Sequence, residues 1–508
     1  MDKKRLSINL IANLLSYGIA TVLSFYLTPF LVRNLGKEIY GFYGIANSFV
    51  SYITVVSTAL NSMASKYITV ELVKGNKERA KQYYTSIFFS NIVLCLILTP
   101  ILVLIILNLS SLLSISNSYV FDVQILFMLI FAAMLLRFVT SIYGSATYSS
   151  NRMDLRAYTE MAKSILRLVL YILLFAIFRP SIIYLGIVLF LLELFNSLVQ
   201  IILARKLTPE LRIRKAYNNV PLVKNTLKVG IWNSLNQLGD LLLSSSDLVV
   251  SNILLGETAS GNISIIKTMP SLISGVITAI NGVFMPRVAH RYAENDTSKL
   301  ISEVKQSQNI MGTMVTPICV LLIVFGYDFY NLWVPGNDIW LLMKLSGLDV
   351  ARMLIIGVVW PVSNLNIVMD RVKIPSLLVI LSGIANILSM ILLVNFTRLG
   401  IYTIVITTLI LTVLFYGLFI PMYPCKFLKV SKLTFLEPII KMIIVTCLAI
   451  LCILPIHVIV NISTWFQFFF FGGICAIITY LISITVFIGP KQVLSVVSKL
   501  RVSKKGKI

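Results

Sequence analysis

The chain has 508 residues, of which 58% are hydrophobic and only 12% are charged. A soluble globular domain carries roughly 25% charged residues, so this composition excludes a soluble protein and indicates a polytopic membrane protein. The formal net charge is +23. Its lysines and arginines lie between apolar runs and do not gather on one polar face, which argues against nucleic acid as a partner.

Fourteen apolar segments are long enough to cross roughly 30 Å of hydrocarbon, so the sequence predicts an all-α fold with about 14 transmembrane helices. The first segment follows the basic residues Lys3, Lys4 and Arg5. It is too long for a signal peptide and lacks a small-residue cleavage site, so we expect it to be a retained span. The predicted spans are 7–31, 39–63, 84–107, 120–148, 157–178, 181–204, 225–252, 260–285, 305–327, 340–369, 374–395, 399–421, 437–457 and 465–488.

The connections between these spans alternate between basic and nearly uncharged. The connection "KGNKERAKQ" at 74–82 is basic, as are 205–215 and the tail 491–508, whereas 108–119 carries no lysine or arginine. The positive-inside rule therefore places both termini in the cytoplasm. No outward connection is long enough to form an external catalytic domain.

The sequence repeats with an offset of 220 residues. The stretch "NLGKEIYG" at 34–41 aligns with "LLGETASG" at 254–261, and the same shift places spans 1 to 6 on spans 7 to 12. Because each half has an even number of spans, we expect two parallel six-helix repeats around a pseudo-two-fold axis, with the substrate site between them. The predicted organisation is an N-lobe at 1–215, a C-lobe at 216–435, two added helices at 436–490 and a basic cytoplasmic tail at 491–508.

Polar side chains follow one face of spans 1, 2, 7 and 8. Asn13 and Asn47 belong to such stripes in spans 1 and 2, and Asn233 and Asn236 begin the longest stripe, in span 7. An unsatisfied polar group in hydrocarbon costs several kcal/mol, so the stripes either face a hydrated cavity or bond across tightly packed helices. The match in register between the four stripes favours the cavity.

Among the charged residues inside the predicted spans, the candidates for a functional role are Arg137, Asp240, Asp247, Lys267 and Arg352. A charge at the bilayer centre costs roughly 2.5–3.5 kcal/mol, so those that are retained usually serve a pathway or a partner. One interpretation is an Asp–Lys pair that holds spans 7 and 8 together. The other is that the cations bind an anionic headgroup while Asp240 or Asp247 senses protons or a cation. The role of Asp349 and the direction in which Arg137 and Arg352 face stay open.

The sequence contains no recognisable catalytic or metal-binding motif. The six cysteines lack CxxC spacing, and His290 and His457 lie far apart. We therefore expect neither an enzyme nor a cofactor, with transport driven by gradients. The alternative from another functional class is an enzyme, namely a membrane glycosyltransferase or polysaccharide polymerase. Such an enzyme would need a sizeable outward loop to carry its catalytic residues.

Three stretches resemble a known family: "PFLVRNLGKEIYGFYGIANSF" (29–49), "SDLVVSNILLGETASG" (246–261) and "MPRVAHRYAEND" (285–296). They are similar to the polysaccharide-transport branch of the multidrug/oligosaccharidyl-lipid/polysaccharide exporter superfamily. The resemblance covers the whole chain in span number, orientation and repeat. It implies a V-shaped central cavity lined chiefly by spans 1, 2, 7 and 8, and alternating access by rocking of the lobes.

The resemblance also implies a function. Members are flippases of the bacterial cytoplasmic (inner) membrane that move undecaprenyl-diphosphate-linked oligosaccharides to the outer leaflet for O-antigen, capsule or exopolysaccharide assembly. Expected partners are this lipid-linked substrate, membrane lipids and the polysaccharide polymerase machinery. Two relatives stay as alternatives: the lipid II flippase, which carries basic residues in spans 1 and 2, and multidrug/cation antiporters, which have twelve spans and an acidic residue in span 1.

Under this resemblance each candidate residue receives a role. Lys267, with Arg137 and Arg352 as further candidates, would hold the diphosphate-sugar headgroup. The sugar hydroxyls would bond to Asn13, Asn47, Asn233 and Asn236. Asp240 or Asp247 would couple H⁺ or Na⁺, unless the membrane potential alone drives reorientation.

Overall fold

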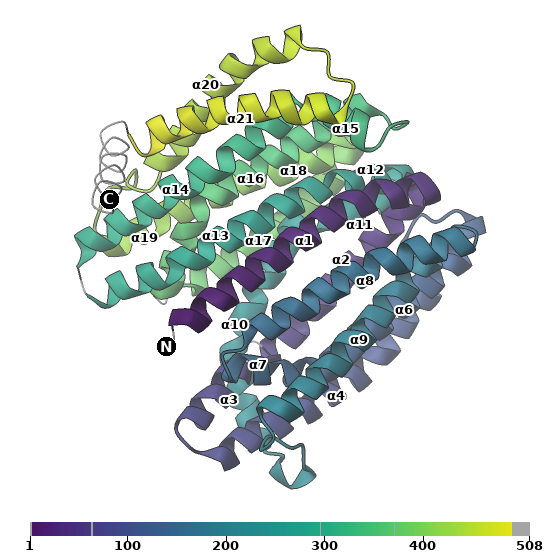
Figure 1. Ribbon diagram of the computed structural model, residues 1–508, viewed down its shortest axis with the longest axis vertical. Coiled ribbons are helices and arrows are strands. Elements are labelled where there is room, and N and C mark those ends of the chain that lie inside the picture. Colours follow the sequence, from purple (N-terminus) through teal and green to yellow (C-terminus); the bar gives the residue numbers. More distant parts are fainter. Residues whose placement is uncertain (1–2, 62–63, 295, 370, 490–508) are drawn as a thin grey trace, which may run out of the picture. The chain divides into compact units, whose positions relative to one another are not determined.

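The computed structural model describes residues 3–61, 64–294, 296–369 and 371–489, and within these ranges every regular element is a helix (Figure 1). This confirms the predicted all-α fold. The chain divides into two compact units, one formed by Met1–Ser264 with Val379–Phe396 and the other by Ile265–Leu378 with Thr397–Ile508. The division follows contacts, whereas the predicted lobes follow the sequence repeat, so the lobe boundaries stay a prediction.

The first unit contains the helices up to the outer part of span 8 and most of α17. Its α-helices are α1 (Lys3–Leu35), α2 (Lys37–Asn61), α3 (Ala64–Val73), α4 (Lys77–Leu107), α5 (Leu109–Leu112), α6 (Val120–Thr140), α7 (Ser145–Ser149), α8 (Met153–Ile177), α9 (Ile183–Leu207), α10 (Val220–Ser244), α11 (Ser246–Leu255), α12 (Glu257–Ile266) and α17 (Lys373–Phe396). Its 3₁₀ turns are η1 (Asn117–Tyr119), η2 (Ser141–Gly144) and η3 (Lys215–Tyr217).

The second unit contains the remaining helices. They are α13 (Thr268–Ala293), α14 (Thr297–Val324), α15 (Gly326–Trp333), α16 (Ile339–Val368), α18 (Tyr402–Thr412), α19 (Ile420–Leu428), α20 (Glu437–Ile459) and α21 (Trp465–Phe487). A π-helical segment, η4 (Val413–Phe419), joins α18 to α19. Helices α20 and α21, the two that follow the predicted repeat, lie side by side and pack on α14 (Figure 1).

The number of membrane-crossing helices differs from the prediction. Among the described residues, eleven helical stretches are long and apolar enough to cross a membrane, and α10 with α11 makes a twelfth. Every predicted span lies on a helix, but α8 and α16, at predicted spans 5 and 10, are not among the twelve. Helix α8 carries charged residues such as Glu160 and Lys163, and α16 is largely buried within its unit. The predicted number of fourteen is therefore not confirmed.

Glycine and proline set two kinds of helix boundary. Gly36 ends α1 at φ 85° and Gly256 ends α11 at φ 88°, in a region that glycine enters without a steric penalty. The Leu-Gly motif of the repeat is thus a helix-stop signal. Pro270 has no backbone N–H to donate to the carbonyl of Ile266, and Lys267 is the single residue between α12 and α13.

A bend of 41° separates α10 from α11. On either side of it, the Ser244 hydroxyl donates to the carbonyl of Asp240 and the Ser246 hydroxyl donates to the carbonyl of Leu242, both at 2.7 Å. Serine hydroxyls that bond back to the preceding turn compete with the helix ladder and bend it. The bend therefore follows from the run of serines in span 7.

The 220-residue offset recurs in the boundaries of the helices. Three helix starts in the first half have a partner 220 positions later: Lys37 and Glu257, Lys77 and Thr297, and Met153 and Lys373. The caps agree as well, because the Asn76 side chain accepts from the backbone N–H of Arg79 and the Asp296 side chain accepts from that of Lys299. These coincidences agree with the predicted repeat.

Helices α2 and α12 touch each other through residues that are 220 positions apart. The contacting pairs are Glu38 with Thr258, Gly41 with Gly261, and Gly44 with Ser264. A residue that contacts the equivalent residue of the other copy, 220 positions away, must lie beside the axis that relates the two copies. In the predicted orientation this contact lies toward the outer end of both helices, where they begin.

A buried amide network holds the opposite end of α2, where Asn61, Asn91 and Ser141 join α2, α4 and η2 at 3.0–3.2 Å. Asn91→Ala removes a buried residue that serves both partners, so we expect it to destabilise the fold by about 1–3 kcal/mol. Thermal unfolding in detergent measures this as a lower Tm. The exposed Asn108, at the far end of α4, supplies the control Asn108→Ala, and equal Tm values for the two variants would contradict the network's role.

Candidate functional site

Three charged side chains meet inside the second unit. The Lys267 ammonium lies 3.2 Å from Oδ2 of Asp349, and the Arg352 guanidinium donates from Nε to Oδ1 of Asp349 at 2.7 Å. The side chain of Asp349 is 1% exposed, that of Arg352 4% and that of Lys267 17%. We call Lys267, Asp349 and Arg352 the charged cluster.

Two helices position the charged cluster. Asp349 and Arg352 are three residues apart on α16, so they lie on the same face of that helix. Lys267 occupies the junction of α12 and α13, and α13 packs along α16. The break before Pro270 therefore places the ammonium beside the buried face of α16.

The charged cluster brings two cations to one carboxylate. Taking a charge out of water is expensive, and a shared carboxylate offsets that penalty for both cations. Arg352 is sealed into the protein, whereas Lys267 keeps part of its side chain accessible. Lys267 is thus the member of the cluster that an anion can reach from outside the protein core.

The structure shows the direction in which Arg352 faces, and it places Arg137 outside the charged cluster. Arg352 faces into the protein and shares Asp349 with Lys267. Arg137 belongs to the first unit, near the end of α6, and its side chain is exposed. Lys267 contacts Asp349 of span 10, and a pair between Lys267 and an aspartate of span 7 stays a prediction.

Three of the four predicted polar stripes lie in the first unit, on α1, on α2 and on α10 with α11, whereas the stripe of span 8 runs from Lys267 along α13 in the second unit. On α10, the Asn236 amide donates to the Asp240 carboxylate at 3.5 Å, and Asp240 is partly exposed. Asp247 is fully buried in the first turn of α11, just beyond the bend. The two aspartates therefore differ in solvent contact, and Asp240 is the more accessible.

The asparagines of α1 and α2 use their amides locally. Asn13 donates to the carbonyl of Asn9, and Asn47 donates to that of Tyr43, both at 2.8 Å. Asn13 is exposed and Asn47 is half-buried. The side chain of Asn233 lies outside the described part of the structure.

One member of the span 1 stripe is structural. The amide of Asn9 donates to the carbonyl of Asn151 at 3.2 Å and accepts from the backbone N–H of Asp154 at 2.9 Å, which ties α1 to the start of α8. Arg152 donates to the carboxylate of the same Asp154, and the hydrogen bond from Arg152 lowers the pKa of that carboxyl group. The side-chain amide of Asn9 therefore has a structural role, because its hydrogen bonds join α1 to the start of α8.

Sequence reasoning missed Asp349 as the partner of both cations. The available signal was the Asp349–Arg352 spacing of three residues inside an apolar segment, which places opposite charges on one helix face. Its contact with Lys267 joins positions 82 residues apart, and no local pattern encodes that distance.

Comparisons with known proteins give a family and a fold. The family model described as "Polysaccharide biosynthesis protein" matches residues 6–291. A curated relative from Bacillus subtilis (strain 168), "Uncharacterized membrane protein EpsK", is 24% identical over 461 residues, which is 91% of each chain. The long apolar helices and this relative identify the chain as a multi-pass membrane protein.

Two solved structures share the fold. An inward-facing multidrug resistance transporter of the MATE family, in the MOP superfamily, has a TM-score of 0.68 at 16% identity and covers 84% of this chain and 98% of its own. The lipid II flippase MurJ, in an inward closed conformation, also has a TM-score of 0.68, at 14% identity, and covers 94% of this chain and 98% of its own. At this identity the similarity concerns the fold alone.

Proposed function

Because the chain belongs to the polysaccharide biosynthesis protein family, we propose that it is a flippase, without enzymatic activity, for undecaprenyl-diphosphate-linked oligosaccharides. It moves the polar headgroup from the cytoplasmic to the outer leaflet of the bacterial cytoplasmic membrane, while the prenyl tail stays in lipid. Both termini lie in the cytoplasm, and the product passes to the polysaccharide polymerase machinery on the outer side.

The charged cluster is the observation that carries this proposal. A diphosphate is anionic, and the cluster gathers two cationic side chains inside a membrane protein, with the Lys267 side chain partly accessible. A charge buried in a membrane protein usually marks a substrate or ion pathway. Lys267 contacts the diphosphate, Arg352 holds Asp349 in place, and Arg137 is a further basic contact.

The polar stripe residues serve the sugars. Asn13, Asn47, Asn233 and Asn236 offer amides that both donate to and accept from hydroxyls, which suits a repetitive carbohydrate. They line a V-shaped cavity between an N-lobe at 1–215 and a C-lobe at 216–435, with 436–490 as added helices. The contact of α2 with α12 supports an arrangement that is closed at its outer end.

Energy for the cycle comes from an ion gradient or from the membrane potential. Moving one charge through 100 mV is worth roughly 2.3 kcal/mol, so the potential alone can bias reorientation. The partly exposed Asp240 and the buried Asp247 are the candidates for H⁺ or Na⁺ coupling.

Replacing both aspartates with asparagine tests the coupling. If either residue carries the ion, Asp240→Asn with Asp247→Asn abolishes the dependence of transport on a pH or sodium gradient in proteoliposomes and leaves its dependence on membrane potential. Unchanged gradient dependence in the folded double variant would contradict the role of both residues.

Binding of a substrate panel to the purified protein separates this function from its alternatives. We expect a short-chain prenyl-diphosphate oligosaccharide to bind with higher affinity than lipid II or a cationic dye. Preference for lipid II would favour the lipid II flippase, in line with the MurJ-like fold. Preference for the dye would favour a multidrug antiporter, in line with the MATE-like fold.

A further inference from the structure

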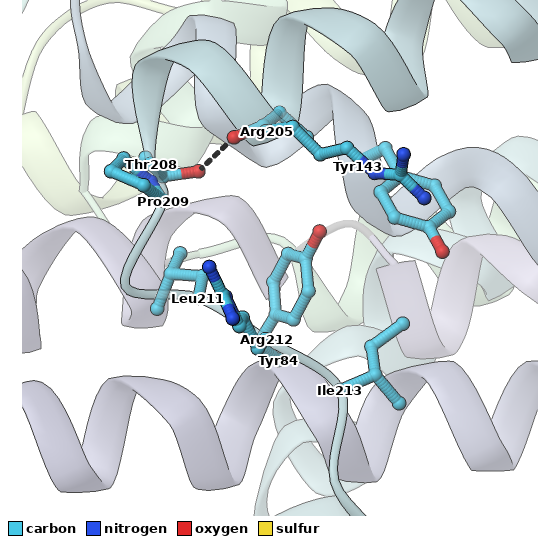
Figure 2. Close-up of a pocket in the computed structure, with 9 residues that line it drawn as sticks. Tyr84, Tyr143, Arg205, Thr208, Pro209, Leu211, Arg212 and Ile213 are labelled. Atoms are coloured by element: carbon cyan, nitrogen blue, oxygen red, sulfur yellow. Dashed lines mark hydrogen bonds between the residues drawn. The ribbon is translucent and has the colours of Figure 1, made fainter.

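A pocket of about 530 Å³ lies within the first unit, where the connection after α9 folds back over α4 and η2 (Figure 2). The rings of Tyr84 and Tyr143 and the side chains of Arg205 and Arg212 line it. We call it the arginine–tyrosine pocket. Its volume falls in the range of roughly 300–1,000 Å³ that is typical of small-molecule sites.

The walls of the arginine–tyrosine pocket are fixed by packing. Tyr84 is 1% exposed and meets Tyr143 edge to face, with ring centroids 6.2 Å apart. Leu211 is buried in the same apolar cluster as Tyr84, which anchors the backbone next to Arg212. On the other side, the Thr208 hydroxyl donates to the carbonyl of Ala204 at 3.1 Å and ends α9 just after Arg205.

The connection is also tied at its far end. The backbone N–H of Asn219 donates to the Ser86 hydroxyl at 2.7 Å, so the segment between α9 and α10 is bonded to α4. A smaller pocket of about 240 Å³ continues from the first through Pro209 and Arg212, and Lys81 and Arg214 line it together with Glu210. The backbone that carries the two arginines is therefore fixed at both ends, and Arg212 lines both pockets.

The charge of the arginine–tyrosine pocket is not balanced by the protein. Within the described ranges, neither Arg205 nor Arg212 forms an ion pair, although other arginines of the chain, such as Arg152 and Arg352, pair with a carboxylate. The two pockets together carry four cationic side chains against one carboxylate. Guanidinium groups present planar forks that match phosphate oxygens, and tyrosine hydroxyls add neutral donors.

We propose that the arginine–tyrosine pocket is a binding site for a phosphate group, held between Arg205 and Arg212 over the two tyrosine rings. The ligand is either the headgroup of an anionic phospholipid or a small phosphorylated solute, because both present the same phosphate chemistry. The basic connection at 205–215 predicts a cytoplasmic location, where anionic headgroups concentrate at the membrane surface. The proposal does not depend on flippase activity, because the charged cluster belongs to the other unit.

Calorimetric titration of the full-length protein in phosphatidylcholine nanodiscs at about 0.15 M ionic strength tests the site. The probes are short-chain phosphatidylglycerol, for the lipid headgroup, and inorganic pyrophosphate, for the free solute. We expect Arg205→Gln with Arg212→Gln to weaken binding by about tenfold or more, because charge-assisted hydrogen bonds are lost. Arg212→Gln alone serves as a second variant, since its exposed side chain is dispensable for packing.

The control keeps the same change in net charge. Lys206, in the last turn of α9, and Lys215, at the start of η3, are close in sequence to the two arginines but line neither pocket, so Lys206→Gln with Lys215→Gln should bind as the unmodified protein does. Loss of the phosphatidylglycerol signal alone identifies a lipid site, and loss of the pyrophosphate signal alone identifies a solute site. Binding of neither probe, or equal weakening in the arginine and lysine double variants, overturns the proposal.

Discussion

Lys267→Gln should reduce headgroup binding and transport by roughly 10- to 100-fold while the protein stays folded. Glutamine removes the positive charge of the ammonium and leaves Asp349 paired with Arg352. A hydrogen bond to a charged group contributes about 1.5–3 kcal/mol, which corresponds to that loss in affinity. Binding of the diphosphate-sugar headgroup and transport rate, both measured on the same preparation, check the prediction.

Two further variants separate binding from folding. Asp349→Ala leaves two cations without their carboxylate in a buried place, so we expect lower Tm and yield, by about 3–5 kcal/mol in stability. Lys344→Gln, on the exposed side of the same helix, removes one charge outside the charged cluster and should change neither property. If Lys267→Gln instead lowers stability as much as Asp349→Ala and leaves the affinity of the folded protein unchanged, Lys267 is only a structural partner of Asp349.

Gly261→Ala should disturb the contact of α2 with α12 and slow transport by about tenfold or more. A Cβ added at Gly261 would lie 2.7 Å from the carbonyl carbon of Lys37 and 3.2 Å from the backbone N–H nitrogen of Glu38. Backbone atoms cannot rotate away as a side chain can, so the helices must separate, at a cost of about 1–3 kcal/mol. The conformation with a closed outer end is then less populated. A transport cycle that passes through this conformation becomes slower.

The contact also allows a direct test of whether this end must open. A Cβ added at Gly44 would lie 3.4 Å from the Cβ of Ser264, so Gly44→Cys with Ser264→Cys in a background without native cysteines should cross-link. Oxidation should stop transport and reduction should restore it. Gly472→Ala is the matched glycine control, because no atom lies within 4 Å of its added Cβ. Full activity in the cross-linked protein, or equal rates for Gly261→Ala and unmodified protein, would contradict a role for opening at this end.

Local pattern predicted most of the fold. Every predicted apolar span lies on a helix, and the offset of 220 brings into register the Leu-Gly motifs whose glycines, Gly36 and Gly256, end their helices. The same offset, applied to Gly41 and Gly261, gives two residues that lie in contact, but their close approach became visible only in three dimensions. The predicted number of fourteen spans is not confirmed, because α8 and α16, which both carry charged residues, are not among the described helices that are long and apolar enough to cross a membrane.

The site was predicted less completely, for a physical reason. The cost of burying a charge marked Lys267 and Arg352 as important without naming their partner. Asp349 had the same residue type and environment in the sequence as Asp240 and Asp247, and only the packing of α13 along α16 distinguishes it. Likewise the arginine–tyrosine pocket arises because a connection folds back over α4, a long-range contact that a basic loop sequence does not encode.

Reconstituted flipping is the measurement that tests the central claim most directly. Liposomes carry a fluorescent undecaprenyl-diphosphate oligosaccharide on one leaflet and contain unmodified protein, Lys267→Gln or Lys344→Gln. We predict transfer to the other leaflet with the unmodified protein and with Lys344→Gln, and transfer close to the protein-free rate with Lys267→Gln. Transfer at the protein-free rate in all three samples, while a cationic dye crosses with the unmodified protein, would contradict the account and favour a multidrug antiporter.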